Sequence, residues 1–186
     1  MDTSDFRNGL HIYVDDQVFT IIEFQHVKPG KGGAFVRTKL RNLRTGGVVD
    51  KTFRAGERVE QAFLTRRPMQ FLYRSGDELT LMDLETYEQA GYPASLFGDG
   101  LRFLKEEMQV HLLDVDGEPI GVELPNSVEL VVTETDPSFR GDTVSGSSKP
   151  ATLETGARIN VPFHINVGDA IRVDTRTGEY LERVKK

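Results

Sequence analysis

The chain of 186 residues contains no cysteine. Disulfide bonds, thiolate metal sites and a catalytic thiol are therefore excluded, and the composition fits a reducing compartment. Long apolar runs are missing as well, since no segment approaches the roughly 20 residues that a membrane-spanning helix requires. The first residues, Met1–Asp5, have neither the basic end nor the apolar core of a secretion signal. We expect a soluble cytoplasmic protein that does not engage a membrane.

Catalytic and metal-binding arrangements are also scarce. The chain has four histidines, His11, His26, His111 and His164, and none lies at a metal-ligand spacing from another. No Gly-x-Ser-x-Gly nucleophile motif occurs. Gly30-Lys31-Gly32 superficially resembles a phosphate-binding loop, but the Ser or Thr and the helix that such a loop requires do not follow the lysine. The sequence therefore predicts a protein that is not an enzyme and that uses no metal or cofactor.

Charge is distributed unevenly along the chain, whose net charge is −6 at pH 7. Residues 26–58 contain nine Lys and Arg against two acidic residues, a local charge of +7 that leaves −13 for the rest. Residues 65–126 contain five cations and twelve carboxylates, a local charge of −7. A basic segment on an acidic chain indicates one face that meets phosphate groups. A well-solvated strand face accounts for the same counts equally well.

Apolar and polar residues alternate along most of the chain, and turn-forming residues separate the alternating runs, which predicts β-structure. In the first third, five short strands are expected over residues 10–14, 18–24, 35–42, 48–53 and 59–63. Five strands in so short a segment suit a small SH3-like barrel. We therefore assign residues 1–64 to a first domain.

Two further blocks follow, over residues 65–126 and 127–186, with a boundary near the proline of Leu124-Pro125-Asn126. They resemble each other in size and in expected number of strands, and each suits a small barrel of the oligonucleotide-binding type. The predicted architecture is all-β, with three small β-barrels in series.

Three segments of these later blocks are expected to depart from simple hairpins. Residues 85–90 read as a short turn or helix, and residues 101–107 carry apolar residues at the spacing of an amphipathic helix. Residues 137–150 are rich in Gly, Ser and Thr and are expected to form a long loop.

The most unusual loop contains one lysine, Lys31, among Lys28, Pro29, Gly30, Gly32 and Gly33, between two expected strands. Proline and glycine favour a turn, and glycine leaves no side chain beside the lysine for it to pack against. Lys31 is therefore expected at the exposed tip of a hairpin. Three interpretations remain: an ordinary solvated lysine, a direct phosphate contact, or the substrate of a modifying enzyme.

Two other sets of residues suit contacts to nucleic acid. Arg37, Lys39 and Arg41 occupy alternate positions, so they share one face of the strand that follows the lysine loop. Cations on the face of a small barrel suit the sugar-phosphate backbone. The segment over residues 140–150 combines Gly, hydroxyl side chains and two cations, which suits either a phosphate-binding loop or a polar connection.

These motifs together resemble the bacterial elongation factor P family. Lys28–Arg37, which reads Lys-Pro-Gly-Lys-Gly-Gly-Ala-Phe-Val-Arg, resembles the modification loop of that family. Gly141-Asp142-Thr143, Lys149–Gly156 and Val173–Tyr180 resemble the signature of its third domain. The resemblance runs nearly from end to end of the chain.

The resemblance implies a fold and a set of site residues. Such factors have an SH3-like (KOW-like) first domain and two oligonucleotide-binding-fold domains, arranged in an L that mimics transfer RNA. Lys31 matches the loop tip, which contacts the acceptor end of the peptidyl-tRNA and in many members carries a covalent extension. Gly141, Asp142 and Thr143 match the loop that contacts messenger RNA in the exit site. Members with arginine at the tip are modified differently, and this chain is not of that kind.

The resemblance also implies a function. The family binds ribosomes between the peptidyl-tRNA and exit sites and stimulates peptide-bond formation at consecutive prolines. The implied partners are ribosomal RNA and proteins, peptidyl-tRNA, the codon in the exit site and a lysine-modifying enzyme, with the factor acting as a monomer. The alternative is a generic RNA-binding or ribosome-associated module without a role at polyproline.

Overall fold

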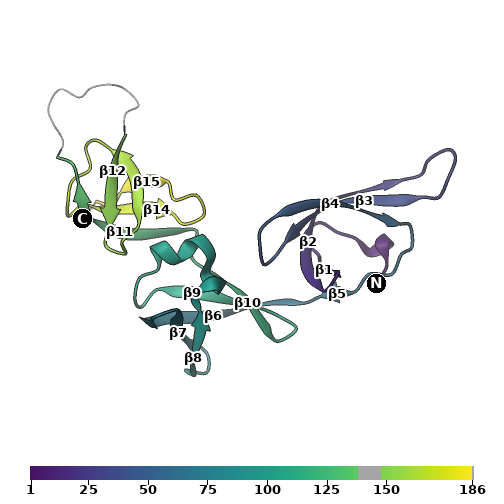
Figure 1. Cartoon of the computed structure of the whole chain (residues 1–186), viewed down its shortest axis with the longest axis horizontal. Helices are drawn as coiled ribbons and strands as arrows, with labels where there is room; N and C mark the ends of the chain where they lie inside the picture. Colours follow the sequence, from purple (N-terminus) through teal and green to yellow (C-terminus); the bar gives the residue numbers. More distant parts are fainter. Residues whose placement is uncertain (138–147, 186) are drawn as a thin grey trace. The chain divides into compact units, whose positions relative to one another are not determined.

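The computed structural model describes residues 1–137 and 148–185, and these residues form three five-stranded antiparallel sheets in chain order (Figure 1). The all-β fold predicted from the alternating pattern is thereby confirmed. Each sheet curls around an apolar core of its own. No helix in the described part of the chain is long and apolar enough to cross a membrane.

The first sheet has the strand order β4-β3-β2-β1-β5 and follows a short 3₁₀ segment, η1 (Thr3–Asp5). Its strands are β1 (His11–Val14), β2 (Gln17–Val27), β3 (Phe35–Asn42), β4 (Val48–Arg54) and β5 (Gln61–Ala62). The five strands expected in this part are all present. The last is short because Val59 instead donates its backbone N–H to the carbonyl of Met1, at 3.0 Å.

The second sheet has the strand order β10-β9-β6-β7-β8. Its strands are β6 (Leu64–Ser75), β7 (Glu78–Asp83), β8 (Gln89–Pro93), β9 (Gln109–Val115) and β10 (Glu118–Glu123). The segment expected as a turn or helix over residues 85–90 is a tight turn followed by the start of β8. Leu79, Leu81 and Leu112 are fully buried and form the centre of this core.

The amphipathic helix predicted over residues 101–107 is wrong. A 3₁₀ segment, η2 (Ala94–Phe103), comes earlier and is interrupted at Gly98, where φ is 54°. The chain then leaves the helical conformation because Glu107 donates its N–H to the Phe71 carbonyl, and the Met108 carbonyl accepts from the Phe71 N–H. A helix over these residues would need the same backbone groups for its own i to i−4 bonds.

The third sheet has the strand order β13-β12-β11-β14-β15. Its strands are β11 (Ser127–Thr135), β12 (Ser148–Leu153), β13 (Arg158–Pro162), β14 (Ala170–Asp174) and β15 (Tyr180–Arg183). The loop expected over residues 137–150 is too long at its end, because Ser148, Lys149 and Pro150 belong to β12 and pair with β13.

Two compact units emerge from the contacts between the described residues. One comprises Met1–Arg66 with Leu113–Gly121, and the other comprises Arg67–Leu112 with Val122–Lys186. In the first unit, the β9–β10 turn is held by the N–H of Asp116, which donates to the Phe63 carbonyl. In the second unit, Phe103 at the end of η2 is fully buried in the core of the third sheet. The domain boundaries at residues 64 and 126 stay predictions.

One turn recurs in all three sheets. It spans Asn42–Gly47 between β3 and β4, Asp83–Glu88 between β7 and β8, and again residues 174–179 between β14 and β15. In each, a side-chain oxygen of the first residue accepts from the N–H of the third residue at 2.8 Å. The threonine in fourth place accepts from the N–H of the sixth residue at 3.3 Å. Backbone bonds of 2.8–2.9 Å join the first residue to the fifth and the sixth.

The fifth residue of this turn always has a positive φ. It is Gly46 with φ 74°, Gly178 with φ 76°, and Tyr87 with φ 63°. Positive φ favours glycine, and a bulky residue in this region is a genuine outlier. Tyr87 is thus the exception among three otherwise equivalent turns.

Candidate functional site

The lysine loop, residues 28–34, joins the ends of the longest hairpin in the first sheet. Val27 at the end of β2 pairs with Phe35 at the start of β3, so the loop begins where the strands are still in register. Figure 1 shows this hairpin projecting beyond the other strands of the first sheet. Residues 28–33 are all exposed and Ala34 is half-buried, so the loop is in solvent up to the start of β3.

Lys31 is exposed at this tip, and in the described part of the chain its ammonium has no hydrogen-bond or ion-pair partner. Around it, a Cβ placed on Gly30 or Gly33 would meet no atom within 4 Å, so space is open on both sides of the lysine. Gly32 has φ +108°, a conformation that side chains rarely adopt. The amine is therefore presented on a loop whose backbone a large partner can approach closely.

Arg37, Lys39 and Arg41 all point away from the core along β3. The strand alternates between these exposed side chains and the buried Val36, Thr38, Leu40 and Asn42. The three cations therefore share the outer face of the sheet, as the alternating pattern predicted.

Carboxylates from the neighbouring strands lie on the same outer face. In the sheet register Lys39 stands between Glu23 of β2 and Asp50 of β4, and its Nζ lies 3.6 Å from Glu23 Oε2. Arg37, by contrast, stands between uncharged Gln25 and Thr52, and its guanidinium lies 5.4 Å from the centre of the Phe35 ring. Arg41 likewise stands between uncharged Thr20 and Val48, so the positive charge of this face is least neutralised at its two arginines.

Gly141, Asp142 and Thr143, the residues assigned to messenger RNA, lie outside the described residues. Their role stays a prediction.

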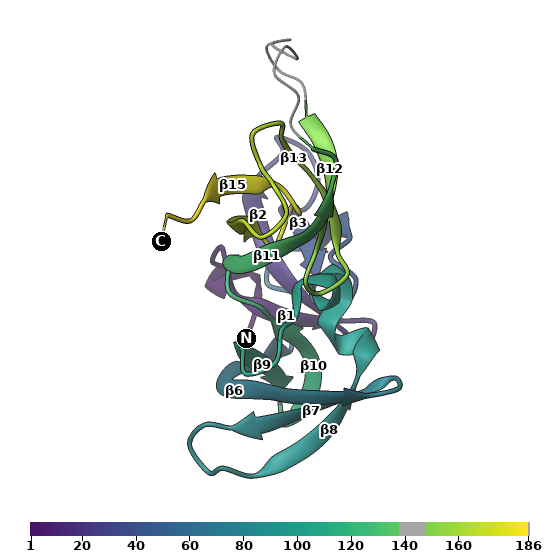
Figure 2. The same cartoon turned by 90° about the vertical axis from the view of Figure 1, so that its left-hand side faces the viewer.

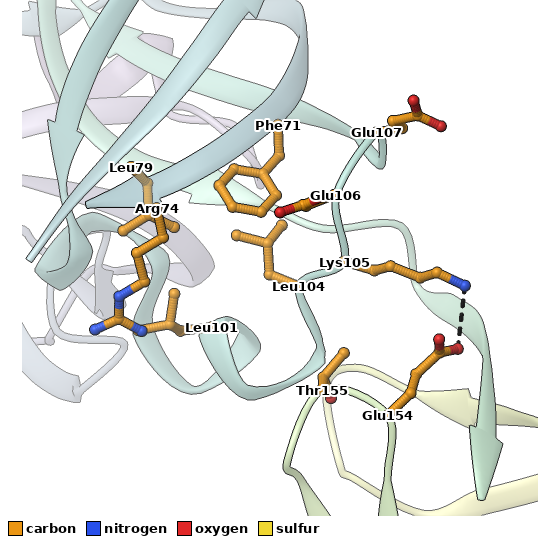
Figure 3. Close-up of a pocket in the computed structure, with 10 residues that line it drawn as sticks. All are labelled: Phe71, Arg74, Leu79, Leu101, Leu104, Lys105, Glu106, Glu107, Glu154 and Thr155. Atoms are coloured by element: carbon orange, nitrogen blue, oxygen red, sulfur yellow. Dashed lines mark hydrogen bonds and ion pairs between the residues drawn. The ribbon is translucent and has the colours of Figure 1, made fainter. Parts of the chain in front are cut away.

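A pocket of about 700 Å³ lies within the second unit (Figure 3). Phe71, Leu101 and Leu104 contribute its apolar wall, while the Lys105 ammonium pairs with Glu154 at 3.1 Å. The same Glu154 oxygen also accepts the N–H of Val131 at 3.0 Å. The Lys105 ammonium is thus neutralised by a carboxylate that is itself held by the backbone, and the lining also carries the exposed carboxylates of Glu106 and Glu107.

Within residues 1–137 and 148–185, no group of three His, Asp or Glu side chains is placed to hold a metal ion. His11 has its Nδ1 3.0 Å from the Thr20 hydroxyl, and burial lowers its pKa. This histidine is a packed strand residue.

Two tyrosines were missed by the sequence analysis. Tyr13 on β1 donates its hydroxyl proton to Asp116 at 2.5 Å, a contact between residues 103 apart in sequence that no local pattern signals. Tyr87 could have been noticed in the sequence, because residues 83–88, 42–47 and 174–179 align with one another. They read Asp-Leu-Glu-Thr-Tyr-Glu, Asn-Leu-Arg-Thr-Gly-Gly and Asp-Thr-Arg-Thr-Gly-Glu, and only the first has tyrosine in place of glycine.

Comparison with known families gives three matches in succession along the chain. The KOW-like domain of elongation factor P matches residues 2–59, its OB domain matches residues 64–122, and its C-terminal domain matches residues 128–183. These matches follow the order of the three sheets.

Curated relatives match over almost the whole chain. An elongation factor P from Pelotomaculum thermopropionicum is 56% identical over 184 residues, which cover 99% of this chain and 100% of the relative. An elongation factor P from Natranaerobius thermophilus is 58% identical over 183 residues, which cover 98% of this chain and 97% of the relative.

Solved structures with a similar fold include two from outside the bacteria. Eukaryotic translation initiation factor 5A from Methanococcus jannaschii has a TM-score of 0.53 and 25% identity, over 64% of this chain and 88% of its own. A translation initiation factor family protein from Naegleria fowleri has a TM-score of 0.56, over 67% of this chain and 96% of its own. At 18% identity, the second likeness shows the fold alone.

The relatives match from end to end, so membership rests on the whole chain and not on one barrel. The three matched domains also confirm the SH3-like and oligonucleotide-binding-type barrels predicted from the strand pattern. The chain therefore belongs to the elongation factor P family and is a translation elongation factor.

Proposed function

We propose that this factor binds the ribosome between the peptidyl-tRNA and exit sites and stimulates peptide-bond formation at consecutive prolines. Lys31 is the residue that contacts the acceptor end of the peptidyl-tRNA. The observation that carries this proposal is the exposed ammonium of Lys31 at the tip of the β2–β3 hairpin, which has no partner among the residues that the structure describes. Family membership supports the ribosome as the partner.

Positioning is the chemistry that this loop can supply. The proline ring fixes the backbone φ angle, which restricts how a prolyl end can be arranged for reaction. Holding the peptidyl-tRNA end in a reactive arrangement lowers the entropic part of the barrier, and it requires no general base on the factor. The ribosome then remains the catalyst, and the factor acts as a monomer in the cytoplasm.

The outer face of β3 supplies the next set of contacts in this proposal. Arg37 and Arg41, with a smaller contribution from Lys39, meet the phosphate backbone near the acceptor end, where charge-assisted hydrogen bonds are strong. Gly141, Asp142 and Thr143 contact the messenger RNA in the exit site. Support for these roles comes from the exposed cations on β3 and from the family match over residues 128–183.

Covalent modification of Lys31 is part of the same proposal. A lysine-modifying enzyme needs access to the amine and to the backbone on both sides, and the open space around Gly30 and Gly33 supplies that access. A longer side chain with a terminal cation would extend the reach of the hairpin without changing the fold. Intact-mass measurement of the protein from its native host, localised to Lys31, tests this part.

A Lys31→Ala variant in a reconstituted translation assay tests the function. We expect it to lose most of the stimulation at Pro-Pro-Pro sequences. It should keep the melting temperature of the wild type, because Lys31 is exposed and has no hydrogen-bond or ion-pair partner in the described chain. Lys28→Ala is the matched control, since Lys28 is also an exposed lysine of the loop, and it should keep most of the stimulation. Full stimulation by Lys31→Ala would favour the generic RNA-binding alternative.

A further inference from the structure

Tyr87 is an exposed aromatic side chain held in an unfavourable backbone conformation. Its side chain is 71% exposed, and φ at this residue is 63°. The two equivalent turns place Gly46 and Gly178 at this position. A bulky residue in this conformation is strained, and such strain persists where the surrounding structure over-determines it.

The turn around Tyr87 is held by bonds in which the ring takes no part. Asp83 accepts from the N–H groups of Glu85 and Thr86 at 2.8 and 3.1 Å, and Arg67 lies 3.4 Å from its other oxygen. The Tyr87 N–H donates to the Asp83 carbonyl at 2.8 Å. In the described chain the hydroxyl of Tyr87 has no hydrogen-bond partner. The ring therefore makes no hydrogen bond that holds the turn in the described chain, and glycine would adopt the positive φ at this position with less strain.

A ring presented in this way suits recognition. The turn projects from the second sheet, where β7 and β8 meet (Figure 2). Tyrosine is enriched at interface hot spots, and its few rotatable bonds keep the entropic cost of docking small. Because the backbone is already fixed by its own hydrogen bonds, little further order has to be imposed on binding.

The charge around the ring identifies the class of partner. Glu85 and Glu88 flank Tyr87 in the turn and are both exposed. The only cation described at this turn, Arg67, is already paired with Asp83. These two carboxylates share the turn with the ring and have no ion-pair partner among the described residues. Such a combination repels phosphate and attracts ammonium and guanidinium groups, which also bind over an aromatic ring.

We propose that Tyr87, with Glu85 and Glu88, docks onto a lysine- and arginine-rich polypeptide surface of the ribosome. This contact rests on the proposed ribosomal function and adds to it a partner class for the acidic second sheet. The proposed partner of Tyr87 is a basic ribosomal protein and not ribosomal RNA.

Binding of the full chain to purified 70S ribosomes tests the contact. We expect Tyr87→Ala to weaken binding on the order of tenfold, as truncation of an interface tyrosine does. Tyr73→Ala is the matched control, because Tyr73 is a 52% exposed tyrosine of the same sheet, and it should bind as the wild type does. An unchanged affinity of Tyr87→Ala, or an equal loss in Tyr73→Ala, overturns the assignment.

Tyr87→Gly separates docking from folding. Glycine relieves the positive φ, so we expect a melting temperature at or above that of the wild type together with the same loss of affinity as in Tyr87→Ala. A clear drop in melting temperature would show that the ring has a structural role and would overturn the proposal.

Charge and cross-linking distinguish protein from RNA. Replacing both carboxylates, by Glu85→Gln with Glu88→Gln, should weaken binding to a basic protein and would tighten binding to RNA. Placing p-benzoylphenylalanine at position 87 should cross-link to a ribosomal protein whose contact site is rich in Lys and Arg. Tighter binding, or an adduct on ribosomal RNA, overturns the partner class.

Stimulation at Pro-Pro-Pro measured against factor concentration separates this contact from the function of Lys31. Tyr87→Ala should recover full stimulation at saturating concentration, because only docking is weakened, whereas Lys31→Ala should not. If Tyr87→Ala behaves as wild type at every concentration while Lys31→Ala fails, the docking contact falls and the proposed function stands. If wild type itself does not bind ribosomes, both fall.

Discussion

The hydroxyl of Tyr13 donates a hydrogen bond to the Asp116 carboxylate at 2.5 Å, which ties β1 to the turn between β9 and β10. This bond, together with partial burial and the nearby acidic charges, raises the pKa of Tyr13 to about 12. The phenol thus adds a side-chain bond to the backbone bond between Asp116 and Phe63, and both hold the β9–β10 turn within the first compact unit. The hydrogen bond exists only while the Tyr13 hydroxyl keeps its proton.

A Tyr13→Phe variant should melt a few degrees below the wild type at neutral pH, because the bond to Asp116 is lost. A phenol whose pKa is higher in the folded chain stabilises the fold fully below its unfolded value, about 10, and stabilisation is lost as the pH rises through the folded value. The difference in melting temperature should therefore narrow between about pH 10 and about pH 12. Thermal unfolding followed by circular dichroism at a series of pH values measures this.

Tyr73→Phe is the control for this titration, since the Tyr73 hydroxyl has no hydrogen-bond partner in the residues that the structure describes. It should melt as the wild type does at every pH. A Tyr13→Phe deficit that stays constant up to pH 12 would mean that the ring packs differently and that the hydroxyl bond contributes nothing.

At the scale of one element, β3 shows what alternation determines and what it leaves open. Alternation along the strand fixes which residues face solvent, so Arg37, Lys39 and Arg41 could be placed on one face from the sequence. It does not fix the neighbours across the sheet. A shift in register between Ile21 and Glu23 sets which β2 residues stand beside which β3 cations, and it places Glu23 beside Lys39.

Charge reversal along β3 should therefore have unequal effects on ribosome binding. Arg37→Glu and Arg41→Glu should each weaken binding and reduce the slope of log affinity against log salt by about 1, as loss of one phosphate contact does. Lys39→Glu should change both less, because Glu23 already neutralises part of its charge. Binding to ribosomes over a range of salt concentrations checks this order, and equal slopes for all three variants would contradict it.

The helix that was wrongly predicted over residues 101–107 also concerns a single element. Leu101, Leu104 and Met108 have helical spacing, yet they face an apolar core from a 3₁₀ segment and an irregular connection. Periodicity reports which side chains are buried, and tertiary pairing of Glu107 and Met108 with Phe71 decides the backbone conformation. The strands could be predicted because their hydrogen bonds follow the alternation itself, whereas this connection depends on a partner more than thirty residues earlier.

At the scale of the whole molecule, the series of barrels was predictable and the sharing of a side chain between two of them was not. Three blocks of alternating sequence give three cores, and Phe103 belongs by sequence to the second block. In the structure it is buried among residues of the third sheet, including Leu130, Leu153 and Ile171. The lysine loop could be read because its exposure follows from local glycine and proline, while a buried contact between barrels leaves no local pattern.

Phe103→Ala should destabilise the core of the third sheet although the substitution lies outside that sheet. Loss of a fully buried phenylalanine costs about 3–5 kcal/mol, because a cavity replaces the ring. Phe97→Ala is the matched control, since Phe97 comes from the same η2 segment but packs in the core of the second sheet. Amide hydrogen exchange should accelerate in β11 and β14 for Phe103→Ala, and in β7 and β9 for Phe97→Ala. Unchanged exchange in β11 for Phe103→Ala would show that the third core closes without the ring, and the second unit would then be two barrels joined only at their surfaces.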